Sequence, residues 1–165
     1  LIVTGVQTCA LPICYVGIDP GQTGAAVVVG ADGLEVLDLQ AWHRSRVPPA
    51  ITVVLAGDVV ALEAQHVGRG NHASLVLAEW TGRLAAALPG PITLIRPLAT
   101  SWRAKVLRDG RLQRDPAKRL AIAAATPHLQ AAGWTDVTAD IAEAWCMARY
   151  ACFWALSHPA EVSSV

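Results

Sequence analysis

Four carboxylates stand where the predicted elements could bring them together. Asp19 ends the apolar run 14–19, and Glu63 ends a second apolar run that begins at residue 58. Asp140 and Glu143 lie near the start of a predicted helix and are three residues apart, so they share one face with Cβ atoms roughly 5–6 Å apart. If the two apolar runs are neighbouring parallel strands, their ends lie side by side, and a helix packed across those ends would complete a four-acid group.

Such a group predicts a site for divalent cations. Like charges in a partly dry pocket raise one another's pKa, and a bound cation removes that penalty. Ligand sets made only of oxygen favour Mg2+ or Mn2+ over zinc. Two such ions held ~4 Å apart hydrolyse phosphodiesters in line, one activating the attacking water and the other stabilising the leaving 3′ oxygen. The sequence therefore predicts two Mg2+ ions, replaceable by Mn2+, as the cofactor.

Each acid also has an ordinary structural interpretation. Asp19 precedes a Pro-Gly pair, and an aspartate there is a common turn former. Asp140 and Glu143 would favour a helix N-terminus through the macrodipole wherever that helix lay. Glu63 is harder to explain in this way, because an unpaired carboxylate in a buried run is costly. The conjunction of all four acids is what favours a catalytic site.

The elements that must position these acids follow from periodicity and turn residues. Three short runs rich in β-branched residues predict consecutive antiparallel strands, and two further strands and several helices follow. Together they predict an α/β fold with a five-stranded mixed sheet, in which three antiparallel strands are followed by parallel additions, flanked by helices. The predicted strands are 14–19, 24–30, 34–42, 58–63 and 91–97, and the predicted helices are 72–88, 100–107, 115–125 and 138–157.

Two finer features are also predicted. Asp115 is expected to be the N-cap of the helix over 115–125, with Pro116 at its first position, and Asn71 to be the N-cap of the helix over 72–88. Four tryptophans in helical or apolar settings are assigned to the core rather than to base stacking. They are Trp102, Trp134, Trp145 and Trp154.

Composition restricts the class of protein. The chain has 165 residues, of which 53% are hydrophobic and 16% charged, as expected for one compact domain. No apolar run reaches the roughly 18 residues that span a bilayer, so no membrane association is predicted. The four cysteines lack disulfide or zinc spacing, which favours a reducing compartment.

Residues 1–13 resemble the translation of a sequencing-library adapter, so we expect a non-native extension there and a single domain over 14–165.

Basic residues cluster although the net charge is zero. Seven of the 13 lysines and arginines lie within 103–119, where Asp109 and Asp115 are the only acids. Such a stripe is typical of phosphate binding. A solvated surface explains it equally well.

Five segments carry a family resemblance through their order and spacing. They are GIDPGQTGAAVV, ALEAQHVGRG, PLATSWRAKVLRDG, DPAKRLAIAAA and DIAEAWCMARYA, within about residues 15–156. Together they resemble the RuvC family of Holliday-junction resolvases, particularly its divergent phage and chloroplast relatives, which have an RNase H-like fold. The resemblance implies an endonuclease that resolves four-way DNA junctions by paired symmetric nicks, through two-metal-ion hydrolysis. It implies that Asp19, Glu63, Asp140 and Glu143 are the catalytic metal ligands.

The resemblance also implies DNA contacts. The family's basic residues near the active site match Arg103 or Lys105, and Lys118. Bacterial resolvases have an aromatic wedge three positions after the acid matched by Glu63, where this chain has His66, which either stacks on a base or lies in a solvated loop. The predicted DNA-binding residues are His66, Arg69, Asn71, Arg103, Lys105, Lys118 and Arg119.

A homodimer and a location follow from the same resemblance. A four-way junction is nearly two-fold symmetric, so a two-fold dimer matches it. We assign the dimer face to the helix 73–88 with Trp80 and Gly82, although Gly82 could instead allow close packing on the sheet. The expected location is the cytoplasm of a bacterial or phage-infected cell, with an organelle as the alternative.

Other functions stay open from the sequence. An RNase H-like nuclease acting on other branched DNA or on structured RNA would use the same acids. A non-catalytic junction-binding protein would not need all four. The segment 17–29 also resembles the first phosphate motif of actin-like ATPases and sugar kinases, but the chain shows no second phosphate loop.

Overall fold

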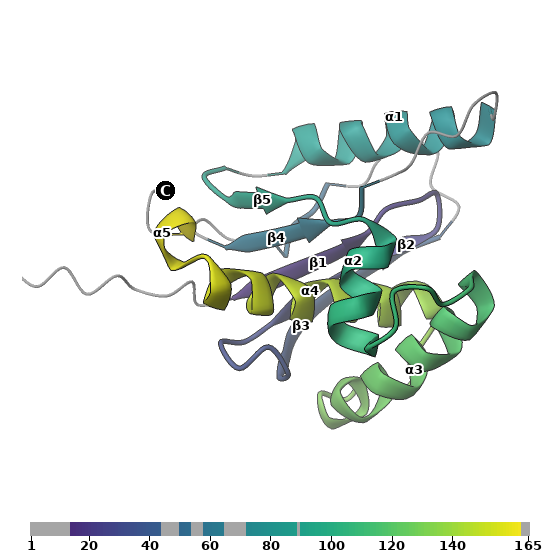
Figure 1. The fold of residues 1–165 in the computed structure, drawn as a ribbon, viewed down its shortest axis with the longest axis vertical. Helices are drawn as coiled ribbons and strands as arrows, with labels where there is room; N and C mark the ends of the chain where they lie inside the picture. The colour runs from purple at the N-terminus through teal and green to yellow at the C-terminus, as the bar shows by residue number, and fades with distance from the viewer. Residues whose placement is uncertain (1–13, 44–49, 54–57, 65–71, 89, 163–165) are drawn as a thin grey trace, which may run out of the picture.

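The computed structural model describes residues 14–43, 50–53, 58–64, 72–88 and 90–162. The predicted extension 1–13 lies outside these residues, and so does the predicted N-cap Asn71. The described part holds one five-stranded sheet with helices on both of its faces (Figure 1). None of the helices within it is long and apolar enough to cross a membrane.

The sheet has the predicted composition and direction. Its order is β3-β2-β1-β4-β5, with β1 antiparallel to β2, β2 antiparallel to β3, and β4 parallel to both β1 and β5. The mixed sheet predicted from the sequence is therefore confirmed. The strands are β1 (Tyr15–Asp19), β2 (Gly24–Val29), β3 (Val36–Trp42), β4 (Val59–Leu62) and β5 (Thr93–Ile95).

The helices occupy the predicted segments with corrected ends. The prediction that Asp115 caps the helix expected over 115–125 is wrong, because Gln113 is the N-cap and Asp115 lies inside the first turn. There its charge favours the positive end of the helix dipole, and Pro116 sits where a missing N–H costs nothing. The helices are α1 (His72–Ala87), α2 (Ala99–Trp102), the π-helix η1 (Arg103–Leu107), α3 (Arg114–Ala131), α4 (Ala139–Ser157) and α5 (Pro159–Val162).

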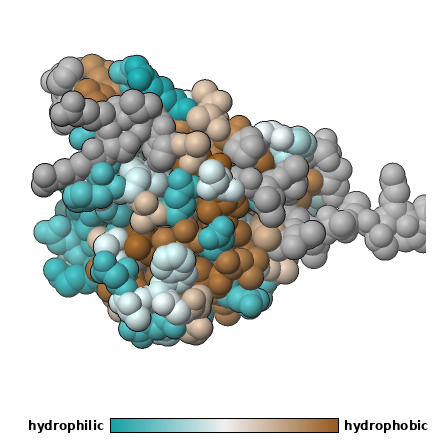
Figure 2. Space-filling model, turned by 180° about the vertical axis from the view of Figure 1, so that it is seen from behind, coloured by the Kyte–Doolittle hydropathy of each residue, from teal (hydrophilic) through white to brown (hydrophobic). Residues whose placement is uncertain are grey.

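Alternating side chains of β1 build two cores. Tyr15 faces α4, which lies across the front of the sheet and is flanked by α3 (Figure 1). Val16 and Ile18 face the opposite layer, where Trp80 and Leu84 of α1 cover them. Figure 2 shows hydrophobic side chains gathered in the middle of the back face with hydrophilic ones around them. This period of two makes β1 the strand that joins both cores.

The tryptophans divide between core and surface. Trp102 and Trp145 are buried as predicted, but Trp134 follows α3 with 39% of its surface exposed, so its assignment to the core was wrong. Trp80 packs inside its own chain, and no atom lies within 4 Å of a Cβ placed on Gly82. Gly82 therefore does not serve close packing on the sheet.

Gly17 allows α4 to lie directly on β1. A Cβ at this position would overlap the carbonyl oxygen of Ala144 and the amide nitrogen of Ala148. Backbone atoms of α4 thus occupy the space that the Cβ of any other residue type at this position would need. The acidic first turns of α4 are brought over the end of β1 by this contact.

We expect Gly17→Ala to lower the free energy of unfolding by about 1–3 kcal/mol or more, because the added methyl must push α4 away from the sheet. Gly82→Ala is the matched control and should raise it by roughly 0.5–1 kcal/mol, since its Cβ meets open space and alanine favours a helix. Urea denaturation measures both values. Equal effects of the two substitutions would contradict the close approach.

Candidate functional site

Two neighbouring strand ends deliver the first two acids. Asp19 is the last residue of β1, and Glu63 follows β4, which pairs with β1 in parallel up to Ile18 and Leu62. The Glu63 amide donates a hydrogen bond to the Ile18 carbonyl at 3.5 Å, which continues the ladder by one residue. After Asp19 the chain reverses direction in a turn. The Gly21 carbonyl in this turn accepts a 2.8 Å hydrogen bond from the Trp42 indole.

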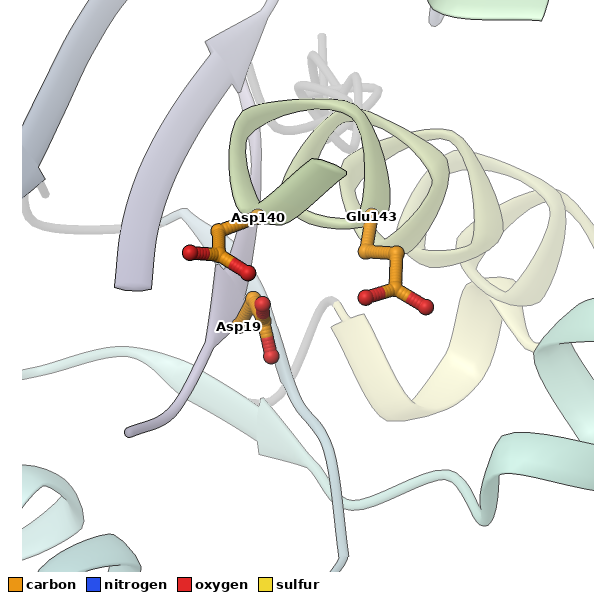
Figure 3. A group of neighbouring side chains, drawn as sticks. All are labelled: Asp19, Asp140 and Glu143. Atoms are coloured by element: carbon orange, nitrogen blue, oxygen red, sulfur yellow. The ribbon is translucent and has the colours of Figure 1, made fainter. Parts of the chain in front are cut away.

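The other two acids come from the start of α4. Thr138 is the N-cap, and its hydroxyl accepts a 3.3 Å hydrogen bond from the Ile141 amide. Asp140 lies in the first turn, where its charge complements the helix dipole. Glu143 follows on the same face, and Figure 3 shows the carboxylates of Asp19, Asp140 and Glu143 grouped around a common space.

Three of the four acids form a compact group. One carboxylate oxygen from each of Asp19, Asp140 and Glu143 lies within 4.8 Å of the other two. Glu63 stands outside this group but lines the same cavity, which has a volume of about 460 Å³. The structure thus brings all four predicted acids to one cavity, while their catalytic role stays a prediction.

Three basic side chains also line the cavity. Arg103 Nη2 lies 3.8 Å from Glu143, and Lys118 Nζ lies 3.8 Å from both Asp140 and Glu143. At 3.8 Å these contacts are ion pairs and are too long to be hydrogen bonds. Arg114 also lines the cavity. The lining therefore holds four acids and three bases.

The electrostatic balance raises the pKa of two acids. Burial is the largest cause of the raised pKa of Asp19, followed by the charges of Glu143, Glu63 and Asp140, while Lys118 acts in the opposite direction. Burial also raises the pKa of Glu143, against the lowering effect of Lys118. The neighbouring bases therefore do not fully offset the combined effect of burial and the other acids.

This donor set fits a divalent cation. Carboxylate oxygens are the only close donors in the three-acid group, and hard cations such as Mg2+ and Mn2+ prefer them. A cation would also stabilise the charged form of Asp19, whose pKa is raised by burial and by the neighbouring acids. Asp19, Asp140 and Glu143 are the residues that could hold it, with Glu63 close by on the cavity wall.

The predicted DNA-binding residues separate into three groups. Arg103 and Lys118 line the cavity. Lys105 and Arg119 are exposed and do not line it, and Lys105 Nζ instead lies 5.6 Å from the centre of the Phe153 ring. The last group, on the segment between β4 and α1, falls outside the described residues and comprises His66, Arg69 and Asn71.

Arg114 is a candidate site residue that the sequence predictions did not select. It lies one helical turn before Lys118 on α3, so both side chains emerge from the same face. That spacing was the available signal. The basic stripe contains several other arginines, however, and only the packing of α3 against α4 shows which of them reach the acids.

A local irregularity turns two consecutive side chains toward the acids. The chain passes from α2 into a π-turn at Arg103, and the turn ends at Arg108 with a positive φ of 63°. Trp102 Nε1 donates a 3.2 Å hydrogen bond to Glu63 Oε1, while Arg103 pairs with Glu143. Single π-turns of this kind are frequent at functional sites.

Comparison with solved structures shows a likeness to a RuvC protein. The structure of Thermus thermophilus RuvC superposes with a TM-score of 0.51 over 87% of this chain and 96% of that chain, at 14% sequence identity. The chain has the RuvC-like, RNase H-like fold. At this identity the likeness concerns the fold alone. No family model and no curated protein matches the chain.

The raised pKa values predict how stability depends on pH and on metal. Asp19 and Glu143 bind protons more tightly in the folded chain than in the unfolded one, where their values are about 3.8 and 4.5. The stability they contribute is therefore present below those values and lost as the pH rises through the raised folded pKa values. We expect the free energy of unfolding in EDTA to fall over this range, and to fall less in Asp19→Asn. Urea denaturation between about pH 4 and about pH 8 measures it.

Divalent cations should restore the free energy of unfolding that the wild-type protein loses as the pH rises. At a Mg2+ concentration about 100 times its Kd, wild-type stability should rise by about 2.7 kcal/mol at neutral pH. Asp19→Asn should lose most of that gain, because it removes one carboxylate of the three-acid group. An equal gain in both proteins would show that the cation binds elsewhere.

Proposed function

We propose that this protein is a Mg2+-dependent endonuclease that resolves four-way DNA junctions. The observation that carries the proposal is the three-acid group at the end of β1, in a cavity whose other polar lining includes Arg103, Arg114 and Lys118. The RuvC-like fold and the order of the sequence motifs support it. A metal-binding cavity with basic walls suits a phosphodiester, since it accepts both the cation and the anion.

The chain's own groups divide the work. Asp19, Glu63, Asp140 and Glu143 are the proposed ligands of two Mg2+ ions, for which Mn2+ substitutes. When bound, such ions activate a water molecule and stabilise the leaving 3′ oxygen of the scissile phosphodiester. Lys118 balances the acids in the metal-free cavity and becomes available to the scissile phosphate once cations neutralise them.

The proposed DNA path extends beyond the cavity. Arg103, Lys118 and Arg114 hold the strand at the cut, and the predicted contacts of Lys105 and Arg119 lie farther along the basic stripe. His66, Arg69 and Asn71 complete the proposed set.

We propose a two-fold homodimer as the active form. Paired nicks in opposing strands need two active sites, and a two-fold dimer matches the symmetry of the junction. Leu75 and Val76 of α1 are exposed, Leu75 by 55%, and supply apolar surface for the proposed interface. Trp80 does not contribute to it, because it is buried against the sheet.

Cleavage of a labelled mobile four-way junction with Mg2+ tests the function. We expect paired nicks at symmetric positions near the crossover, mapped on all four strands. Glu63→Gln should reduce cleavage by at least about 100-fold while binding survives, because it removes a metal ligand and leaves the basic wall intact. A Y-fork and an RNA–DNA hybrid are the comparison substrates. Preference for the hybrid, or unpaired nicks, would refute junction resolution.

Substitution of Arg114 tests the basic wall separately from the metal ligands. We expect Arg114→Gln to weaken junction binding. A plot of the logarithm of the association constant against the logarithm of the salt concentration should become less steep by about one, as for the loss of one phosphate contact. Arg111→Gln is the matched control, since Arg111 is exposed in the same stripe but does not line the cavity. Electrophoretic mobility shifts at several salt concentrations, in Ca2+ to prevent cleavage, give both slopes. Equal slopes for the two variants would contradict the role of Arg114.

A further inference from the structure

Glu63 is held differently from the other three acids. Its Oε1 accepts the 3.2 Å hydrogen bond from Trp102 Nε1, and among the described residues no other hydrogen bond or ion pair reaches its side chain. Oε2 is therefore available to a ligand in the cavity. The carboxylate stays apart from the group formed by Asp19, Asp140 and Glu143.

The donor is itself tightly held. Trp102 is 1% exposed and belongs to the core between α4 and the sheet. The guanidinium carbon of Arg103 lies 5.2 Å from the centre of its ring. The indole therefore has little freedom to turn, and its N–H points at Glu63 from a fixed place.

Other buried indoles show that this contact is not a general property of the core. Trp145 is 2% exposed and packs in the same cluster, yet its Nε1 has no hydrogen-bond partner among the described residues. Trp80 is in the same situation in the second cluster. Of these three buried indoles, only Trp102 directs its N–H at a side chain of the acidic cavity.

We propose that Trp102 is a positioning residue, which sets the Glu63 carboxylate as a separate fourth metal ligand. The indole N–H fixes one oxygen and so orients the other toward the cavity. Without this hydrogen bond, the Glu63 side chain could adopt several rotamers. Cation binding would then have to compensate for the conformational entropy lost when the carboxylate is ordered. The inference rests on the proposed function only in that the cavity binds divalent cations.

Mn2+ binding to the DNA-free protein tests the inference directly. Trp102→Phe removes the N–H and keeps an aromatic ring, and we expect the affinity for the more weakly bound Mn2+ to fall by about 10-fold. Trp145→Phe is the matched control, because it loses the same ring volume from the same core without losing a hydrogen bond to an acid. Calorimetry and the electron paramagnetic resonance signal of free Mn2+ measure both affinities.

A second background separates positioning from general damage. In Glu63→Ala, the added change Trp102→Phe should have no further effect on Mn2+ affinity if the indole acts through Glu63. A loss that persists in that background would overturn the proposal, and so would equal losses in Trp102→Phe and Trp145→Phe. If the Phe variant does not fold, replacing Trp102 with a benzothiophene analogue, which keeps the bicyclic shape and removes the N–H, gives the same comparison.

The outcome is independent of the substrate. Protein that cuts no four-way junction but shows the expected pattern of Mn2+ affinities would refute the proposed function and leave this inference standing. Protein that resolves junctions while Trp102→Phe and Trp145→Phe bind Mn2+ alike would do the opposite.

Discussion

Repulsion among carboxylates that share one cavity is the constraint on which the arrangement of this protein depends. Burial and the neighbouring acids raise the pKa of Asp19, and burial raises that of Glu143. Lys118 and Arg103 offset part of the repulsion from 3.8 Å. Because that distance exceeds a close hydrogen bond, the bases balance the acids without sealing them off. The cavity thus holds acids whose repulsion is only partly offset, beside basic side chains that line the same wall.

Rigid backbone contacts hold the acids together against this repulsion. Because Gly17 has no side chain, the backbone of α4 can pack directly on β1. Thr138 caps α4 and fixes the residue at which the helix begins. Asp19 is the last residue of β1, which belongs to both cores. Sites built on strands and helices are placed more accurately than sites on loops. Stability elsewhere in the domain therefore offsets the electrostatic cost of bringing these acids together.

Local patterns predicted much of the fold, and two predictions failed where packing rather than local sequence decides. β1, β4 and α4 were predicted from apolar periodicity, which survives because burial selects it at every position. The N-cap at Asp115 was wrong because a cap residue biases a helix boundary by only about 1 kcal/mol, and packing of α3 on α4 readily shifts it. Trp134 was assigned to the core from its helical or apolar setting, yet it follows the end of α3 and is 39% exposed.

The sequence by itself indicated the strands and helices along the chain and the four acids near their ends, because the strand and helix periods follow from the local spacing of residue types. That β1 and β4 are parallel neighbours was decided by the tertiary structure. Only the tertiary structure decided that Arg114 lines the cavity while Lys105 lies against Phe153, and that Trp102 donates to Glu63. These contacts join residues far apart in the chain. They depend on the π-turn and on the rotation of packed helices, both of which are properties of the assembled core rather than of any short segment.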